Sequence, residues 1–158
     1  MGIEGIPAGA LKMRRIRCRE EVCIGCRLCE VWCQVEHSKS KEIINAFLRE
    51  TAFPRVRVEE RGPISISLQC RHCEEPNCVH ACISGALYRD LETCVVKHDA
   101  SKCVGCWSCV LACPYDAIIR DDAHNRVLKC DLCEGREEPI CVEKCPNDAL
   151  IVEAYDAL

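Results

Sequence analysis

Cysteines recur at short, regular spacings along this chain, and one run is complete. From Cys103 it reads cysteine, two residues, cysteine, two residues, cysteine, three residues, cysteine, and then Pro114. In such a run three thiolates on a tight loop hold one [4Fe–4S] cube, and the fourth ligates a different cube. Gly105 gives that loop its backbone freedom. A single cysteine pair would leave zinc or a redox disulfide open, but this spacing predicts iron–sulfur chemistry and a partner site elsewhere.

Four groups of this kind, named quartets one to four in chain order, contain sixteen of the eighteen cysteines. Quartet one has the same spacing as quartet three, while the second gap widens to four residues in quartet two and to seven in quartet four. The quartets are Cys23, Cys26, Cys29 and Cys33; Cys70, Cys73, Cys78 and Cys82; Cys103, Cys106, Cys109 and Cys113; and Cys130, Cys133, Cys141 and Cys145. Sixteen thiolates match the ligand requirement of four [4Fe–4S] clusters, so we expect all sixteen to bind iron.

The composition limits the compartment in which such a chain works. A high cysteine content in 158 residues is typical of secreted disulfide scaffolds. The first residues, however, lack the charged and then apolar segments of a signal peptide. No run of about 18 apolar residues is present either. We therefore expect a reducing, cytoplasmic location and no membrane span.

Charge points away from nucleic acid as a partner. The formal net charge is −4, and each oxidised cube with its four thiolates would add about two negative charges. A basic segment precedes quartet one and contains Lys12, Arg14, Arg15, Arg17 and Arg19. Two interpretations stay open for it: a solvated strand face, or an electrostatic dock for an acidic patch on another subunit or on a second copy of this chain.

Short strands and helices must position the quartets. Period-two alternation predicts a strand at 13–18, hairpins at 55–58 with 64–68, 86–89 with 93–97 and 117–120 with 126–129, and a closing strand at 149–152. A helix should begin within 30–32. The insertion after quartet one predicts a second helix at 41–50, with Ile43, Ile44, Phe47 and Leu48 on one face. We expect this helix to pack against a cluster lobe or a partner. Residues 1–12 read as a flexible arm.

Cluster assembly should supply most of the folding free energy. Structural metal sites in small domains contribute on the order of 10–16 kcal/mol, whereas whole domains are stable by about 5–15 kcal/mol. We therefore expect the iron-free chain to be largely unfolded.

The quartet pattern resembles the four-cluster electron-transfer subunits of molybdenum and tungsten oxidoreductases. The resemblance rests on the four quartets, on the segments 69–76 and 129–133, and on the Cys-Pro-x-x-Ala-hydrophobic endings at 113–118 and 145–150. It implies an α+β fold of duplicated bacterial-ferredoxin-like lobes with short hairpins and an inserted helix. The outer dicluster lobe would comprise 13–69 and 126–158, and the inner dicluster lobe 70–125.

The resemblance also implies how the quartets share clusters, with one paired to four and two paired to three. The implied sites are site 1 (Cys23, Cys26, Cys29 and Cys145), site 2 (Cys130, Cys133, Cys141 and Cys33), site 3 (Cys70, Cys73, Cys78 and Cys113) and site 4 (Cys103, Cys106, Cys109 and Cys82). Pairing in chain order, one with two and three with four, is the alternative. Gln34 and Ile83 stand where proline often follows the last cysteine, which puts the local backbone in question.

The resemblance implies that the chain is a non-catalytic subunit. It would relay electrons between a large molybdenum or tungsten subunit and an acceptor. A flavin-containing, NAD-linked subunit is one candidate acceptor. The segment 35–40 resembles most the small subunit of a cytosolic, anaerobic tungsten aldehyde oxidoreductase. Self-association is a further possibility. The alternatives are a stand-alone polyferredoxin and the ferredoxin-like partner of carbon monoxide dehydrogenase. A zinc module is disfavoured because these quartets do not divide into Cys-x₂-Cys pairs. A catalytic subunit is disfavoured because no substrate-binding motif is present.

A few residues outside the quartets carry secondary expectations. Cys18 and Cys94 read as small buried hydrophobes. His72 and His80, inside quartet two, face solvent or donate N–H bonds to cluster sulfur. Trp32 and Trp107 either shield clusters from water or serve packing alone.

Overall fold

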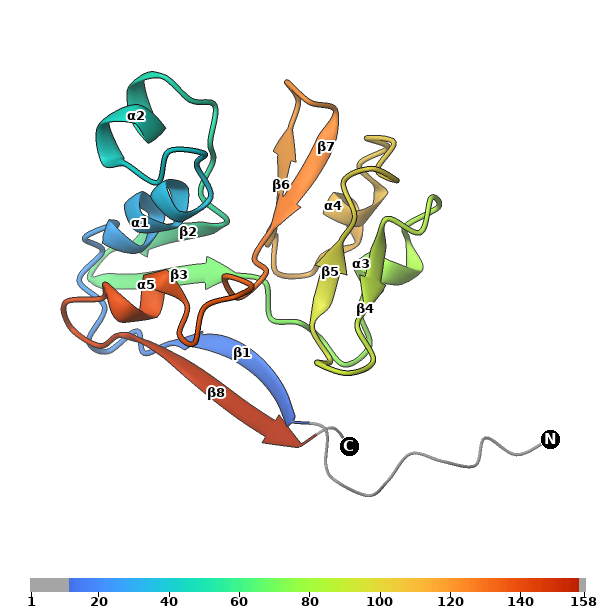
Figure 1. Ribbon diagram of the computed structural model, residues 1–158. Helices are drawn as coiled ribbons and strands as arrows, with labels where there is room; N and C mark the ends of the chain where they lie inside the picture. The colour runs from blue at the N-terminus through green and yellow to red at the C-terminus, as the bar shows by residue number, and fades with distance from the viewer. Residues whose placement is uncertain (1–11, 157–158) are drawn as a thin grey trace.

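The structure is a computed structural model that describes residues 12–156 (Figure 1). The predicted flexible arm lies outside these residues, except for Lys12 at the start of the first strand. The strands pair as β1 (Lys12–Cys18) with β8 (Leu150–Asp156), β2 (Val56–Arg61) with β3 (Ile64–Gln69), β4 (Leu87–Arg89) with β5 (Val96–His98), and β6 (Ile118–Asp121) with β7 (Arg126–Lys129). The helices are α1 (Leu28–Glu36), α2 (Ile43–Leu48), α3 (Asn77–His80), α4 (Ser108–Ala112) and α5 (Ile140–Glu143).

Each strand pair in the described residues is a separate antiparallel two-stranded sheet. The period-two alternation located each of them to within a few residues, because one face of each hairpin is buried. The α+β class with short hairpins and few helices is thereby confirmed.

Strands β1 and β8 close the fold by joining the two ends of the described residues. Ile16 lies opposite Val152, and Arg15 lies opposite Glu153. Arg15 and Arg17 both form ion pairs with Glu153, and Arg19 donates to the backbone oxygen of Asp148 at 3.2 Å. These arginines therefore stabilise the closure, which favours the strand-face interpretation of the basic segment.

The short helices bring quartets together in pairs. Helix α1, from quartet one, packs against α5, from quartet four, and α3, from quartet two, packs against α4, from quartet three. Figure 1 shows α1, α5, β1 and β8 on one side of the molecule and β4, β5, α3 and α4 on the other. The expected boundary between the lobes, at 125–126, falls in the β6–β7 hairpin, and the division into two lobes stays a prediction.

Helix α2 is shorter than expected, and its apolar face does not pack against the rest of the protein. Ile43, Ile44, Phe47 and Leu48 are between 45% and 78% exposed. The small Ala46 is the buried residue of this helix, and its backbone oxygen accepts a bond from Gln34 Nε2 at 3.3 Å. Contact through alanine keeps the helix close to α1 and leaves the larger side chains at the surface. The helix thus packs against α1, which carries quartet one, but through Ala46 and not through its larger apolar side chains.

The buried core is unusually rich in thiols. Five of the twelve buried residues in the larger core cluster are cysteines, namely Cys29, Cys33, Cys70, Cys130 and Cys141. Large aliphatic side chains are correspondingly few there. In a core with this many thiols, the groups that bind the thiols should decide its stability.

Removal of iron tests this inference. A chelator under reducing conditions should abolish cooperative thermal unfolding and most of the circular dichroism, because the thiol-rich core then lacks its central bonds. Iron and sulfide added back should restore both signals. An iron-free protein that keeps the native spectrum and melts cooperatively would contradict the inference.

Candidate metal centres

All eighteen cysteines are free thiols in the structure. The sixteen of the quartets lie at the loops and short helices between the hairpins, so none is removed from ligand chemistry by a disulfide. Free thiols at these spacings, all but Cys26 and Cys106 buried or half-buried, are the donor set that [4Fe–4S] clusters require.

The same backbone turn occurs in every quartet, just before its second cysteine. The residue there has a left-handed conformation, with φ of 66° at Gly25, 47° at His72, 66° at Gly105 and 58° at Leu132. In quartets two and four its N–H also donates to the first cysteine, from His72 to Cys70 Sγ and from Leu132 to Cys130 Sγ, each at 3.4 Å. The turn allows the flanking cysteines to face a common point.

A second repeated feature fixes the last cysteine of quartets two to four. Gly85, Asp116 and Asp148 are left-handed, and a backbone N–H just after each donates to the preceding sulfur. The bonds are Leu87 N to Cys82 Sγ at 3.4 Å, Ala117 N to Cys113 Sγ at 3.5 Å and Ala149 N to Cys145 Sγ at 3.2 Å. Such bonds favour the thiolate form. Ile83 in place of proline leaves this arrangement unchanged.

Quartet one departs from the repeat, and the insertion compensates. Because Gln34 replaces proline, α1 continues past Cys33 to Glu36. The donor to Cys33 Sγ is instead the backbone N–H of Arg55, at 3.1 Å, at the far end of the insertion. Gln34, the residue in place of proline, therefore changes which residue donates to the last cysteine of quartet one. The hydrogen bond itself is kept.

The structure brings the thiols of sites 1 and 4 together around small cavities. Cys23, Cys26, Cys29 and Cys145 line one cavity. Cys82, Cys103, Cys106 and Cys109 line another. Each of these sets contains three cysteines of one quartet and the last cysteine of a different quartet. Cys26 and Cys106 are the exposed members, so each set reaches the molecular surface.

The thiols of sites 2 and 3 interact electrostatically and are more deeply buried. Burial, and then the negative charges of Cys130, Cys33 and Cys133, raise the pKa of Cys141. Burial, and then the charges of Cys70 and Cys113, raise the pKa of Cys73. These neighbours are those that the pairing of quartet one with four, and of two with three, brings together. Ligation itself stays a prediction.

Burial sets the protonation of these thiols when no iron binds them. It raises the pKa of Cys29 and Cys109 to about 11 and that of Cys130 to about 12. At neutral pH these three thiols are therefore protonated when no iron binds them, and iron has to displace their protons. The donor set fits iron–sulfur clusters, which would supply one-electron redox chemistry when bound.

His72 independently indicates that an iron–sulfur cluster fits beside quartet two. It is 1% exposed, and its Nδ1 accepts a bond from the backbone N–H of Val96 at 3.2 Å. Burial lowers its pKa to about 3, so the ring is neutral and carries its proton on Nε2. Nε2 is buried and has no partner among the described residues. A cluster sulfur is a suitable acceptor for this N–H. His80, by contrast, is exposed.

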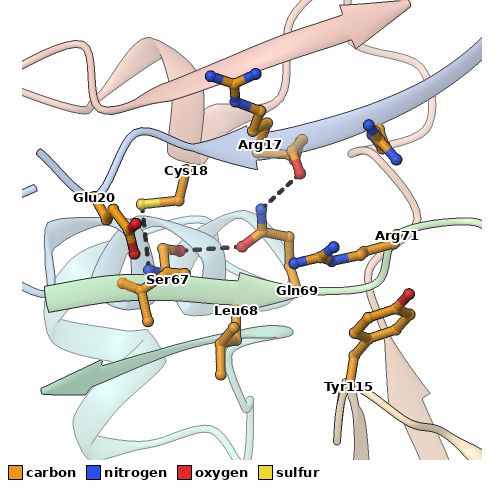
Figure 2. Close-up of a pocket in the computed structure, with 11 residues that line it drawn as sticks. Arg17, Cys18, Glu20, Ser67, Leu68, Gln69, Arg71 and Tyr115 are labelled. Carbon is orange, nitrogen blue, oxygen red and sulfur yellow. Dashed lines mark hydrogen bonds between the residues drawn. The ribbon is translucent and has the colours of Figure 1, made fainter. Parts of the chain in front are cut away.

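The two cysteines outside the quartets and the two tryptophans make packing and hydrogen-bond contacts within the protein. Cys94 is buried, as expected, whereas Cys18 is half-buried and accepts a bond from Ser67 N at 3.4 Å. Cys18 lines a cavity of about 330 Å³, to which Arg17 and Arg71 also contribute. Figure 2 shows Cys18 between β1 and β3, near Glu20 and Ser67. Trp107 packs against the thiols of the smaller core cluster. Lys144 lies over the Trp32 ring at 5.3 Å.

Sequence reasoning missed a polar cluster beside site 2. His37 Nε2 lies 3.2 Å from Asp131 Oδ1, and Arg55 pairs with the same carboxylate. Although burial opposes it, these partners hold the pKa of Asp131 well below its usual range. His37, Asp131 and Cys133 lie close enough to share one ion, but Arg55 already neutralises the carboxylate. No spacing links residues this far apart in sequence, so no local signal could have found them.

Comparison with known proteins gives consistent matches. The family described as 4Fe-4S dicluster domain matches residues 64–154. The electron transport protein HydN of Escherichia coli (strain K12) is 38% identical over 145 residues, covering 82% of this chain and 81% of HydN. The thiosulfate reductase electron transfer subunit PhsB of Salmonella typhi is 35% identical over 146 residues, covering 83% and 70%.

Two further matches extend the comparison. The B subunit of anaerobic dimethyl sulfoxide reductase from Escherichia coli (strain K12) is 33% identical over 148 residues, covering 86% of this chain and 71% of its own length. Among solved structures, the active site complex BamBC of benzoyl coenzyme A reductase with 1,5-dienoyl-CoA contains a polypeptide that aligns with a TM-score of 0.53 and 25% identity. That alignment covers 93% of this chain and 79% of the other.

Replacement of Gly105 tests the repeated geometry of the turns. A Cβ there would lie 2.7 Å from the backbone oxygen of Asn125, and the residue would stay left-handed at φ 66°. Gly105→Ala should therefore cost the protein the cluster at site 4, about four of its irons.

Gly62→Ala is the matched control, because Gly62 is also left-handed but no atom lies within 4 Å of its added Cβ. This control should lose only about 1–2 kcal/mol of stability and keep its full iron content. Full iron and wild-type stability in Gly105→Ala would show that the turn does not position the site.

Proposed function

The protein belongs to the 4Fe-4S dicluster family of electron-transfer subunits, and from this premise we propose that it carries four [4Fe–4S] clusters and relays electrons between two partners. Its role is electron transfer and not catalysis, as in relatives that are electron transport proteins or subunits of reductases. The observation that carries the four-cluster proposal is the grouping of sixteen free thiols into four sets.

The proposed ligands are those of sites 1 to 4. The dicluster match begins at residue 64, after quartet one. The family match alone therefore does not establish that there are four clusters. The packing of α1 against α5 and the pairing of β1 with β8 support the two sites that quartet one shares with quartet four. The packing of α3 against α4 supports the other two in the same way.

A continuous thiol-rich core supports a relay through the molecule. Cys29, Cys33, Cys70 and Cys130 belong to one buried cluster, so sites 1, 2 and 3 adjoin one another. Cys113 packs against both core clusters and so links site 3 to site 4. The exposure of Cys26 and Cys106 supports an entry and an exit at the two ends of this series. Buried side chains around the inner sites would exclude water between them.

The proposed partner is a large catalytic subunit with a molybdenum or tungsten cofactor, and tungsten aldehyde oxidoreductase is the specific candidate. PhsB and the dimethyl sulfoxide reductase subunit support a reductase complex in general. A flavin-containing NAD-linked subunit is the proposed acceptor, and self-association stays a prediction. No helix in residues 12–156 is long and apolar enough to cross a bilayer. The cytoplasmic, anaerobic setting stays a prediction as well.

Double variants can test which quartets share a cluster. Cys26→Ala and Cys145→Ala should each disturb site 1, so the double variant should lose no more iron than the larger single loss. Cys26→Ala with Cys113→Ala affects sites 1 and 3, and its losses should add. Iron measured per protein molecule after anaerobic purification gives both results. Additive losses for Cys26 and Cys145 would favour pairing in chain order.

Anaerobic purification from the native host should identify the partner. Tungsten in the co-purifying complex is the expected result, while molybdenum would indicate another member of the reductase class. Nickel would instead support the carbon monoxide dehydrogenase alternative. A stable holoprotein that purifies alone would favour a stand-alone polyferredoxin and contradict the proposed complex.

A further inference from the structure

Lys129 is a buried cation for which the described residues supply no counter-ion. It ends β7, immediately before Cys130, and is 3% exposed. Its Nζ donates to the backbone oxygens of Val96 and, at 2.7 Å, of Cys130. No ion pair within residues 12–156 includes it. Nearby Lys97 differs, because its Nζ lies 2.8 Å from both Asp90 and Glu134.

The polar groups around Lys129 do not neutralise it. The Val96 oxygen that accepts from Lys129 is an uncharged carbonyl, and the Val96 N–H donates to His72, a side chain that carries no negative charge. The carboxylate of Asp131 is already paired with Arg55 and His37. A buried charge without a partner is strongly unfavourable. An anion that the protein itself does not provide should therefore lie close to Lys129.

The position of Lys129 indicates which anionic groups could lie close to it. Its Nζ donates to the backbone oxygen of Cys130, a ligand of site 2, and to that of Val96. The backbone N–H of Val96 donates to His72, which lies between the site 3 ligands Cys70 and Cys73. Burial raises the pKa of Cys78, another site 3 ligand, and the positive charge of Lys129 opposes that shift. Cys70 of site 3 and Cys130 also share one buried core cluster. Lys129 thus lies where the two inner sites meet, between the two pairs of quartets.

Resting on the proposed four-cluster function, we propose that Lys129 holds a fixed positive charge at the junction of sites 2 and 3 and raises the reduction potentials of the two clusters there. Each oxidised cluster with its thiolates carries about two negative charges, and reduction adds another. A nearby cation in a medium of low dielectric constant stabilises the added electron. One electron leaves one site and enters the other; no bond forms or breaks and no proton moves.

Lys129→Gln tests the proposal, because it removes the charge and keeps an N–H donor for the Val96 oxygen. The readout is a potentiometric titration of the anaerobic full-length protein, followed by electron paramagnetic resonance. Two of the four clusters should become harder to reduce, with their reduction equilibrium constants lowered about tenfold or more, which is about 59 mV for one electron. The other two should not change.

Two matched variants separate charge from packing. Lys129→Arg keeps the charge and should keep the wild-type potentials, whereas Lys97→Gln removes a compensated charge nearby and should shift none. Unchanged potentials in Lys129→Gln, or equal shifts in all four clusters, would overturn the proposal. If Lys129→Gln fails to load clusters, loading by Lys129→Arg supports the need for charge, and failure of both overturns it. Wild-type protein with far fewer than four clusters would instead defeat the proposed function itself.

Discussion

Bonding of iron to buried thiolates is the interaction on which the rest of this structure depends. The described residues form four small two-stranded sheets and short helices, none of which could bury enough apolar surface to be stable alone. Thiols occupy central core positions where other domains have leucine or isoleucine. Burial raises the pKa of Cys29, Cys33, Cys130 and Cys141, so a metal has to displace the protons of these thiols. Folding, cluster assembly and the ability to conduct electrons are therefore one property of the protein in this account.

The protein solves the same local problem four times with different residues. Each quartet needs a left-handed residue before its second cysteine, and glycine, histidine and leucine all occupy that position. Quartets two to four receive an N–H donor from the first residue of the following strand or from the residue just before it. Quartet one has lost the helix-ending proline, and Arg55, at the end of the insertion, provides the donor instead. The insertion therefore has a structural role at site 2. It also carries α2 with its exposed apolar residues.

Local sequence patterns were sufficient to predict much of this fold. Cysteine spacing predicted the candidate ligands, and period-two alternation predicted the hairpins, because both signals are contained within a few consecutive residues. The grouping of the ligands into sites came from the family resemblance. The exposed face of α2 was not predictable, since periodicity shows that a helix has an apolar face but not what covers it. Lys129 and the contact of His37 with Asp131 were also missed. Their importance comes from burial and from neighbours distant in sequence, which no local pattern records.

The central claim is that four clusters hold this polypeptide together and carry its electrons. Iron and acid-labile sulfide counted per protein molecule, in anaerobically reconstituted protein whose thiols are titrated in parallel, test it most directly. The account predicts about sixteen irons and sixteen sulfides, with only Cys18 and Cys94 left to react. Iron well below that number, or cysteines joined to each other as disulfides, would contradict it.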